Sequence, residues 1–268
     1  GEAATDGEAT ADGEAVADGA EVGAVDETEG TEVVEELITN TWVLTSINKQ
    51  NALGGWPVTA LWSSDGTVIG SSGCNYYNTN AAVEGDSISF TVPTSTRMMC
   101  PSEAVMLQEN IFLGALGNVT TFSDTGLELI LSDDTGDLEI RFTSLAAMEA
   151  TSWLVESYMD STGAEVDIAA DSAITANFEN NTLSGNDGCA NYQSQYSVDG
   201  EIIFFLPPEY SPAGTDAIEC ATGDVREQQA RDYEIALQQA RLYEFRDDSL
   251  NLYDDQHDLV ISYRAVTE

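Results

Sequence analysis

The stretch GSSGCNYY, residues 70–77, returns later in the same chain as GNDGCANY, residues 185–192. Each copy has a glycine, two polar residues, a second glycine, a cysteine and a tyrosine three positions after that cysteine. The match continues without a gap from GCNYYNTNAAVEGDSISF (73–90) to GCANYQSQYSVDGEIIFF (188–205). A repeat of this length indicates that one domain is written twice.

Both ends of the repeat are also duplicated. NTWVLTSI corresponds to TSWLVESY, and LSDDTGDLEIRF corresponds to LYDDQHDLVISY. We therefore predict two domains, at residues 37–146 and 151–267. Residues 1–36 contain small and acidic residues and no basic ones, with the near repeats DGEATA, DGEAVA and DGAEVG. This composition predicts a disordered acidic tether. An array of calcium loops is the alternative for this segment, for which the sequence offers only the spacing.

Each copy is predicted to contain several strands and one helix. Alternating apolar and polar positions predict the strands, and VEGD and VDGE are turn sequences between them. The first helix is expected at residues 102–116, and the second at residues 223–241. The predicted inward residues are Ala104, Leu107, Ile111 and Ala115 in the first helix, and Val225, Tyr233, Ala236, Leu237 and Ala240 in the second. The expected fold class is α+β, with two tandem small domains that each pack a curved antiparallel sheet on one helix.

The charge balance restricts the partners of the chain. Its 268 residues include 48 acidic and 8 basic residues, for a formal net charge of −40. Such a surface repels phosphate backbones and anionic lipids, so we expect no nucleic-acid partner. No apolar run approaches the ~18 residues of a transmembrane segment. Four cysteines in two similar contexts favour an oxidising, extracytoplasmic location, either secreted or tethered to the cell envelope.

The cysteines are Cys74, Cys100, Cys189 and Cys220. A nucleophilic cysteine needs a base, and the only histidine, His257, lies in a turn where the first copy has Gly136. The cysteines form no CxxC pair and supply no zinc ligand set. We therefore predict structural disulfides, no catalytic residue, no cofactor and no metal. Three pairings exist, and the duplication favours Cys74–Cys100 with Cys189–Cys220.

Glycines and acidic turns have local explanations. Gly70 with Gly73, and Gly185 with Gly188, are expected to supply positive φ or a close backbone approach before a strand. Two hairpin turns carry aspartates, which favour turn bonding, and weak divalent-cation binding there is the alternative. These aspartates are Asp133, Asp134, Asp137, Asp254, Asp255 and Asp258.

The aromatic residues divide into two groups. Trp42, Trp153, Phe90 and Phe205 repeat between the copies and are expected in the cores. Trp56 and Trp62 have no aromatic counterpart at the aligned spacing, where Asn177 corresponds to Trp62. We interpret Trp56 and Trp62 as candidate exposed binding residues of the first copy.

With these residues noted, the sequence resembles the META domain family, the HslJ-like heat-inducible lipoprotein group. The resemblance rests on the early tryptophan of each copy, on GSSGCN, and on TSTRMMC ending at Cys100. The second copy departs from the pattern, with Ala190 in place of Asn75 and TDAIEC before the helix. If the Asn75 side chain caps a turn, the second copy must use Asn191 or lose the cap. The resemblance implies a small curved sheet on a helix in bacterial proteins that are exported or lipid-anchored. It also implies envelope or stress functions, with no established catalytic activity.

These observations predict a non-enzymatic, exported tandem-domain protein that acts as a binding or structural module at the cell envelope. Its partner would be an unidentified protein or small ligand. One alternative is a subunit of an extracellular assembly, formed by self-association of exposed edge strands. A second alternative is an acid-dependent hydrolase, although nothing singles out two of the 48 carboxylates.

Overall fold

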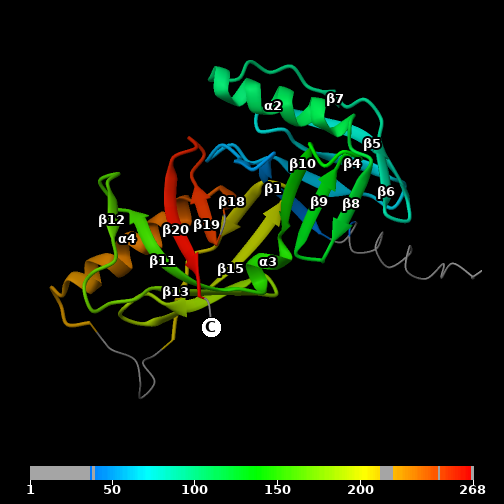
Figure 1. Cartoon of the computed structure of the whole chain (residues 1–268). Coiled ribbons are helices and arrows are strands. Elements are labelled where there is room, and N and C mark those ends of the chain that lie inside the picture. The colour runs from blue at the N-terminus through cyan, green and yellow to red at the C-terminus, as the bar shows by residue number, and fades with distance from the viewer. Residues whose placement is uncertain (1–36, 38–39, 212–219, 247, 267–268) are drawn as a thin grey trace, which may run out of the picture.

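The computed structural model describes residue 37 and residues 40–211, 220–246 and 248–266, so the predicted tether at 1–36 lies outside the described residues. The two repeats form two strand-rich domains in one continuous body (Figure 1). Domain 1 contains β1 (Thr41–Ile47), β2 (Gln50–Asn51), β3 (Thr59–Trp62), β4 (Thr67–Ser71), β5 (Tyr76–Glu84), β6 (Ser87–Phe90), β7 (Thr94–Ser95), α2 (Glu103–Leu116), β8 (Thr121–Asp124), β9 (Glu128–Ser132) and β10 (Glu139–Ser144). Domain 2 contains α3 (Ala146–Glu149), β11 (Ser152–Met159), β12 (Glu165–Asp167), β13 (Thr175–Glu179), β14 (Thr182–Asn186), β15 (Asn191–Asp199), β16 (Ile202–Phe205), β17 (Glu209–Tyr210), α4 (Val225–Gln239), β18 (Leu242–Arg246), β19 (Ser249–Tyr253) and β20 (Leu259–Ala265).

Each sheet closes into a barrel, where a curved antiparallel sheet packed on one helix was predicted. In domain 1 the antiparallel order is β10-β9-β8-β6-β5-β4-β3-β1, and β1 pairs again with β10. Domain 2 repeats this arrangement from β11 to β20, which also pair with each other. The closing strands come from the two ends of each repeat. Alternation within a strand predicts that strand but does not identify its neighbours, so closure was not predictable from periodicity.

The helices lie where they were predicted, but the buried face of α2 is different. Leu107 is 60% exposed and Ile111 is 44% exposed, whereas Val105 and Phe112 are buried. Because α2 carries apolar residues on both faces, helical spacing alone could not choose between them. In α4 the predicted inward residues are buried except Val225, which is exposed in the first turn.

One aromatic residue from each helix fills the end of its barrel. Phe112 packs edge-to-face against Tyr77 of β5 and Phe142 of β10, which lie on opposite sides of the eight-strand ring. In domain 2 the corresponding Tyr233 also hydrogen-bonds to Tyr192 (2.8 Å) and Tyr263 (3.0 Å) through the hydroxyl groups. Burial raises the pKa of Tyr233 well above its ordinary value, which keeps this hydroxyl chain protonated.

The domains join through a packed helix. Met148 of α3 is buried in the core of domain 2, and its carbonyl accepts a hydrogen bond of 3.0 Å from Trp153 Nε1. An equivalent hydrogen bond is found at the beginning of domain 1, where Trp42 Nε1 donates to the Leu37 carbonyl at 3.3 Å. Val43 of β1 also packs in the core of domain 2. A side chain of domain 1 is therefore part of the core of domain 2.

Candidate functional site

The two glycines of each motif meet different backbone requirements. A Cβ added at Gly70 would lie 2.0 Å from the Thr59 carbonyl oxygen, and one at Gly185 would lie 1.9 Å from that of Thr175. Strands β4 and β14 therefore approach a neighbouring strand too closely for any side chain. The second glycines have positive φ, +100° at Gly73 and +94° at Gly188. Both expectations for the motif, close approach and positive φ, apply, one at each glycine.

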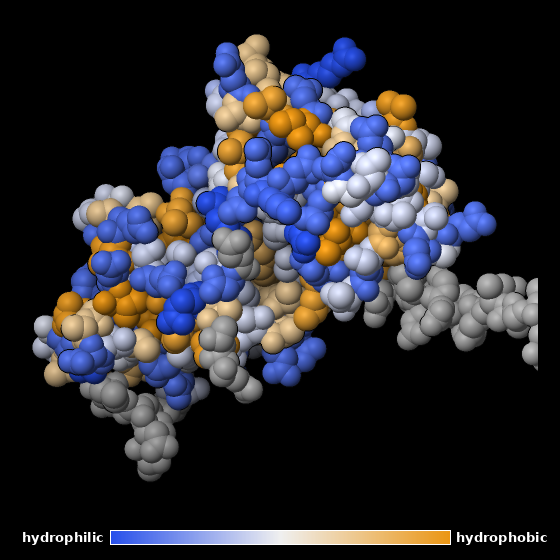
Figure 2. All heavy atoms as spheres, viewed as in Figure 1, coloured by the Kyte–Doolittle hydropathy of each residue, from blue (hydrophilic) through white to orange (hydrophobic). Residues whose placement is uncertain are grey.

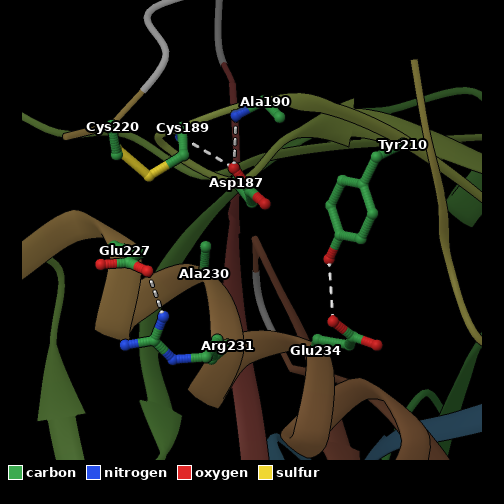
Figure 3. Close-up of a pocket in the computed structure, with 9 residues that line it drawn as sticks. All are labelled: Asp187, Cys189, Ala190, Tyr210, Cys220, Glu227, Ala230, Arg231 and Glu234. Atoms are coloured by element: carbon green, nitrogen blue, oxygen red, sulfur yellow. Dashed lines mark hydrogen bonds and ion pairs between the residues drawn. A yellow bond between two sulfur atoms is a disulfide. The ribbon is translucent and has the colours of Figure 1, made fainter. Parts of the chain in front are cut away.

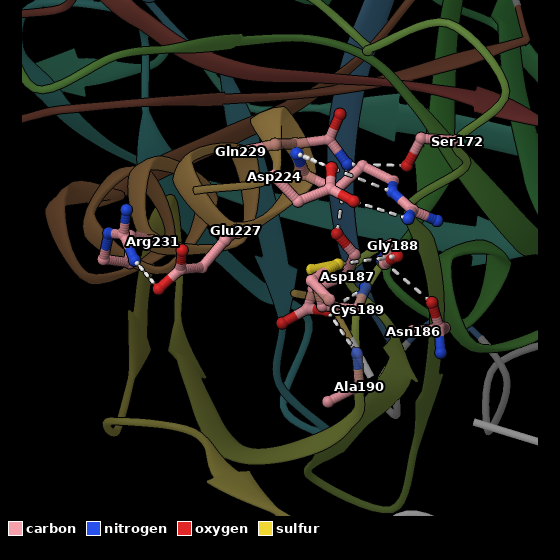
Figure 4. Close-up of a disulfide and its surroundings, with 12 residues drawn as sticks. Ser172, Asn186, Asp187, Gly188, Cys189, Ala190, Asp224, Glu227, Gln229 and Arg231 are labelled. Atoms are coloured by element: carbon pink, nitrogen blue, oxygen red, sulfur yellow. Dashed lines mark hydrogen bonds and ion pairs between the residues drawn. A yellow bond between two sulfur atoms is a disulfide. The ribbon is translucent and has the colours of Figure 1, made fainter. Parts of the chain in front are cut away.

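The predicted disulfides are both present. Cys74 bonds to Cys100, with their Cα atoms 5.8 Å apart, and Cys189 bonds to Cys220, with their Cα atoms 5.1 Å apart. Each bond joins the motif loop, defined as residues 70–75 or 185–190, to the segment before the helix. Figure 4 shows the surroundings of the bond in domain 2. The motif therefore anchors the start of each helix to the barrel.

A buried glutamine of each helix also holds this region, and sequence reasoning missed it. Gln108 accepts a hydrogen bond from Leu53 N (2.7 Å) and donates to the Trp56 carbonyl (3.2 Å). Gln229 has the corresponding role in domain 2, where it accepts from Ala169 N at 2.8 Å. The sequence feature that could have identified this role is the glutamine at the same position of both helices.

In domain 1 a carboxylate from α2 fills the space beside the motif loop. Glu109 Oε2 accepts hydrogen bonds from Ser72 Oγ (2.7 Å) and Asn75 N (3.0 Å). Its Oε1 accepts from Asn75 Nδ2 at 3.0 Å. Asn75 Oδ1 in turn accepts from Met98 N at 2.6 Å. The Asn75 side chain therefore ties the motif loop to the segment at Thr96 and Met98, and Glu109 binds the loop amide.

In domain 2 the carboxylate comes from the loop itself. Asp187, which corresponds to Ser72, accepts hydrogen bonds from Cys189 N (2.8 Å) and Ala190 N (2.7 Å) on Oδ1. Ala230 stands where α2 has Glu109, directly after the shared glutamine. Asn191 does not supply the cap, since its Oδ1 accepts from Asn186 Nδ2. Asp187 takes the place of Glu109 as the acceptor for the Ala190 amide, and Asn191 does not replace Asn75. The counterpart of Met98, which Asn75 binds, is Ile218, and it lies outside the described residues.

This exchange leaves a cavity in domain 2. Ala190 and Ala230 are too small to fill the volume that Asn75 and Glu109 occupy in domain 1. The cavity measures about 390 Å³. Figure 3 shows it between the disulfide, the helix and β17. Its lining residues are Asp187, Cys189, Ala190, Tyr210, Cys220, Glu227, Ala230, Arg231 and Glu234.

Hydrogen bonds and one ion pair organise the cavity wall. Arg231 pairs with Glu227 at 2.7 Å, and the Tyr210 hydroxyl donates to Glu234 Oε2 at 3.1 Å. Partial burial, together with the charges of Glu234 and Asp187, raises the pKa of Tyr210. The tyrosine therefore stays a donor at neutral pH, and the cavity keeps acidic acceptors beside an aromatic wall.

The prediction that Trp62 is an exposed binding residue was wrong. Trp62 is 8% exposed and packs edge-to-face on Phe90 at 5.7 Å. Trp42 pairs with Ala60, and Trp153 pairs with Ala176, so the true counterpart of Trp62 is the buried aromatic Phe178. The ungapped alignment of the two repeats is shifted by one residue at Trp62, because the β3–β4 and β13–β14 turns differ in length.

Trp56 has a partner within the chain. It stacks on His257 of domain 2, with ring centroids 3.6 Å apart. The neighbouring Gly55 donates its N–H to Glu244 Oε2 (3.3 Å), and its carbonyl contacts His257 Nδ1 at 2.5 Å. Arg246 donates to the Ala52 carbonyl at 3.1 Å. The loop at 52–56 is therefore an interdomain contact, which assigns Trp56 and the single histidine to holding the domains together.

We expect the Glu244→Gln variant to change how stability depends on pH. Burial raises the pKa of Glu244 above its ordinary value of 4.5, so the folded protein holds this proton more tightly than the unfolded chain does. The resulting stabilisation is present below pH 4.5 and is lost as pH rises through the raised pKa. The wild-type free energy of unfolding should therefore fall relative to that of the variant between pH 4.5 and pH 7 in denaturant titrations. The exposed Glu179→Gln is the control, and a constant difference between the Glu244→Gln and wild-type curves would contradict the assignment.

The acidic turns use their carboxylates locally. Asp133 Oδ1 accepts from Leu138 N, and Asp254 Oδ1 accepts from Gln256 N and Asp258 N. Among the described residues, the one group of three potential metal ligands is Cys74, Cys100 and Glu109, whose sulfur atoms form the disulfide. The described residues therefore offer no support for a cation site at the turns.

A second hollow lies on domain 1. It measures about 310 Å³ and lies between α2 and the β1–β2 region, with Leu44, Ile47, Leu107 and Ile111 in its wall. Figure 2 shows apolar side chains over α2, and further apolar patches elsewhere on the same face. No helix of the described residues is long and apolar enough to cross a membrane.

Two helix-closed antiparallel barrels, each with a disulfide-anchored glycine motif, define a tandem-repeat β-barrel protein. The META domain profile matches residues 35–145 and 146–266, and the chain belongs to the META domain family. This confirms the resemblance and its two copies. No curated protein matches the chain.

Three solved structures are similar to a single repeat. A Burkholderia xenovorans protein solved by NMR is 25% identical over 42% of this chain and 86% of its own, with a TM-score of 0.35. A second NMR structure is 19% identical over 43% and 97%, with a TM-score of 0.37. A duf4847 family protein from Bacteroides vulgatus, solved by crystallography, is 12% identical over 41% and 96%, with a TM-score of 0.31.

Proposed function

We propose that this protein is an exported, non-enzymatic module of the cell envelope that binds a small ligand through domain 2. The cavity beside the Cys189–Cys220 bond carries the proposal, because the same place in domain 1 is filled by Glu109 and Asn75. A ligand pocket is concave, mostly preformed and lined by apolar groups with a few placed polar atoms. Ala190, Ala230, the disulfide and Asp187 supply that combination.

Export is supported by the two disulfides, since such bonds persist in oxidising compartments. A binding role is favoured over catalysis because the only histidine is engaged by Trp56 and Gly55 at the domain contact. Edge-strand assembly is the weaker alternative. Closure of the barrels leaves β2, β7, β12 and β17, each two or three residues long, as the outlying strands among the described residues.

A cavity-filling variant tests this function. Asp187→Ser combined with Ala230→Glu places the Ser72 and Glu109 pair of domain 1 into domain 2 and leaves the net charge unchanged. In a thermal-shift screen of small cationic, neutral and anionic compounds, some compounds should stabilise the wild type and not the variant. A ligand at one hundred times its dissociation constant adds about 2.7 kcal/mol to the free energy of unfolding. If every stabilising compound acts equally on both proteins, the cavity is not the binding site.

A further inference from the structure

We infer that the domain 2 cavity binds a small organic cation, an ammonium or guanidinium group on a short apolar body. This inference rests on the proposed function and names its ligand class. It follows from the charge balance of the cavity wall, from one carboxylate oxygen of Asp187 that is open to the cavity, and from the contrast with domain 1.

The wall carries two acidic groups without a basic partner. Glu227 is neutralised by Arg231 at 2.7 Å, which leaves Asp187 and Glu234. Within the described part of the chain, the donors to Glu234 are the neutral Tyr210 and Gln238. Both carboxylates act electrostatically on Tyr210, which places them around the same side chain. A cation in this cavity would therefore meet two uncompensated negative charges.

Asp187 also offers a free acceptor. The residue is only 2% exposed, and both of its backbone hydrogen bonds go to Oδ1. Among the described residues no donor reaches Oδ2, and Figure 3 shows this oxygen directed into the cavity, away from the loop amides. Asp187 Oδ2 is not among the fully buried atoms without a partner, so this oxygen of a largely buried residue is open to the cavity. A positively charged donor makes the strongest hydrogen bond to such a carboxylate oxygen.

The remaining wall suits an organic body rather than a bare metal ion. The Cys189–Cys220 bond, Ala190, Ala230 and the Tyr210 ring present apolar surface. A divalent cation such as Ca²⁺ needs six to eight oxygen ligands, and the described residues hold no group of three acidic ligands within coordination reach here. An aromatic wall adds cation–π attraction for an alkylammonium or guanidinium group.

Domain 1 keeps the disulfide but lacks the other parts of this arrangement. Counting along the helices from Gln108 and Gln229, Met106, Asn110 and Leu113 stand where α4 has Glu227, Arg231 and Glu234. Glu109 fills the space, and both of its oxygens accept hydrogen bonds from the motif loop. The cation site is therefore specific to the second repeat, and domain 1 is its internal control.

Calorimetric titration of the whole chain tests the inference, with n-butylammonium, n-butanol and butyrate as probes in 1 M NaCl. At this ionic strength the screening length is about 3 Å, which suppresses general attraction to the acidic surface. We expect one n-butylammonium to bind per chain, with n-butanol and butyrate at least tenfold weaker. Glu234→Gln keeps an acceptor for Tyr210 and should weaken n-butylammonium by about tenfold or more, since hydrogen bonds to charged groups are worth roughly 1.5–3 kcal/mol.

The Asp187→Ser, Ala230→Glu variant should lose n-butylammonium binding at unchanged net charge. Asp199→Ser with Gln239→Glu, a neutral exchange at exposed positions outside the cavity, should leave binding unchanged. Circular dichroism checks that each variant is folded. If the Asp187→Ser, Ala230→Glu variant does not fold, Glu234→Gln provides the test.

The inference is overturned if n-butylammonium binds to the folded Asp187→Ser, Ala230→Glu variant, or to Glu234→Gln, as tightly as to the wild type. If n-butanol or butyrate binds as tightly as n-butylammonium, and the Asp187→Ser, Ala230→Glu variant abolishes this binding, the cation assignment fails and the proposed function stands. If no probe or screened compound depends on the cavity, both fail.

Discussion

The Gly185→Ala variant is expected to lose about 4 kcal/mol of the free energy of unfolding of domain 2. The new Cβ would lie 1.9 Å from the backbone oxygen of Thr175 in the neighbouring strand β13. Backbone atoms cannot move aside as a flexible side chain can, so β13 and β14 must separate and the barrel ladder must distort. Denaturant unfolding followed by tryptophan fluorescence and circular dichroism measures the loss.

The same substitution at Gly70 should destabilise domain 1 to a similar extent, since its Cβ would lie 2.0 Å from the Thr59 oxygen. Gly114→Ala is the matched control. A Cβ at Gly114 meets nothing within 4 Å, and alanine favours the helix by about 1 kcal/mol over glycine. A mild effect of Gly185→Ala, comparable to that of the control, would show that the strands do not approach as described.

Replacing both Cys189 and Cys220 by alanine is expected to cost about 3–4 kcal/mol of unfolding free energy. The bond closes a loop over 31 residues of sequence separation and ties the motif loop to the start of α4. Cys74 and Cys100, at a separation of 26, should give a similar loss in domain 1. Denaturant titration of each double variant against the oxidised wild type measures the cost, and a loss below about 1 kcal/mol would contradict an anchoring role.

The repeat made several features predictable from the sequence. Two copies of one motif reduced the pairing of four cysteines to one arrangement, and both disulfides agree. The final hairpin was also predictable, because LELIL and LEIRF flank a turn of aspartate and glycine, and β9 pairs with β10 as expected. These features depend on residues close in sequence or on comparison of the two copies.

Other features depend on contacts that no local pattern encodes. Barrel closure joins β1 to β10 across the whole repeat. Trp62 was misassigned because turns of different length shift the alignment by one residue, and a shift of one reverses the face of a strand. The cavity required a comparison across space, because Asp187 on the loop takes over a role of Glu109 on the helix.

Chemical-shift mapping of the ¹⁵N-labelled chain with n-butylammonium locates the binding site in one repeat or the other. We expect saturable shifts of the amides of Cys189, Ala190 and Ala230, which line the domain 2 cavity. The corresponding amides of Cys74, Asn75 and Glu109 should not move. Shifts of equal size in both motif loops, or shifts confined to the apolar hollow beside α2, would contradict a binding site created by the second repeat.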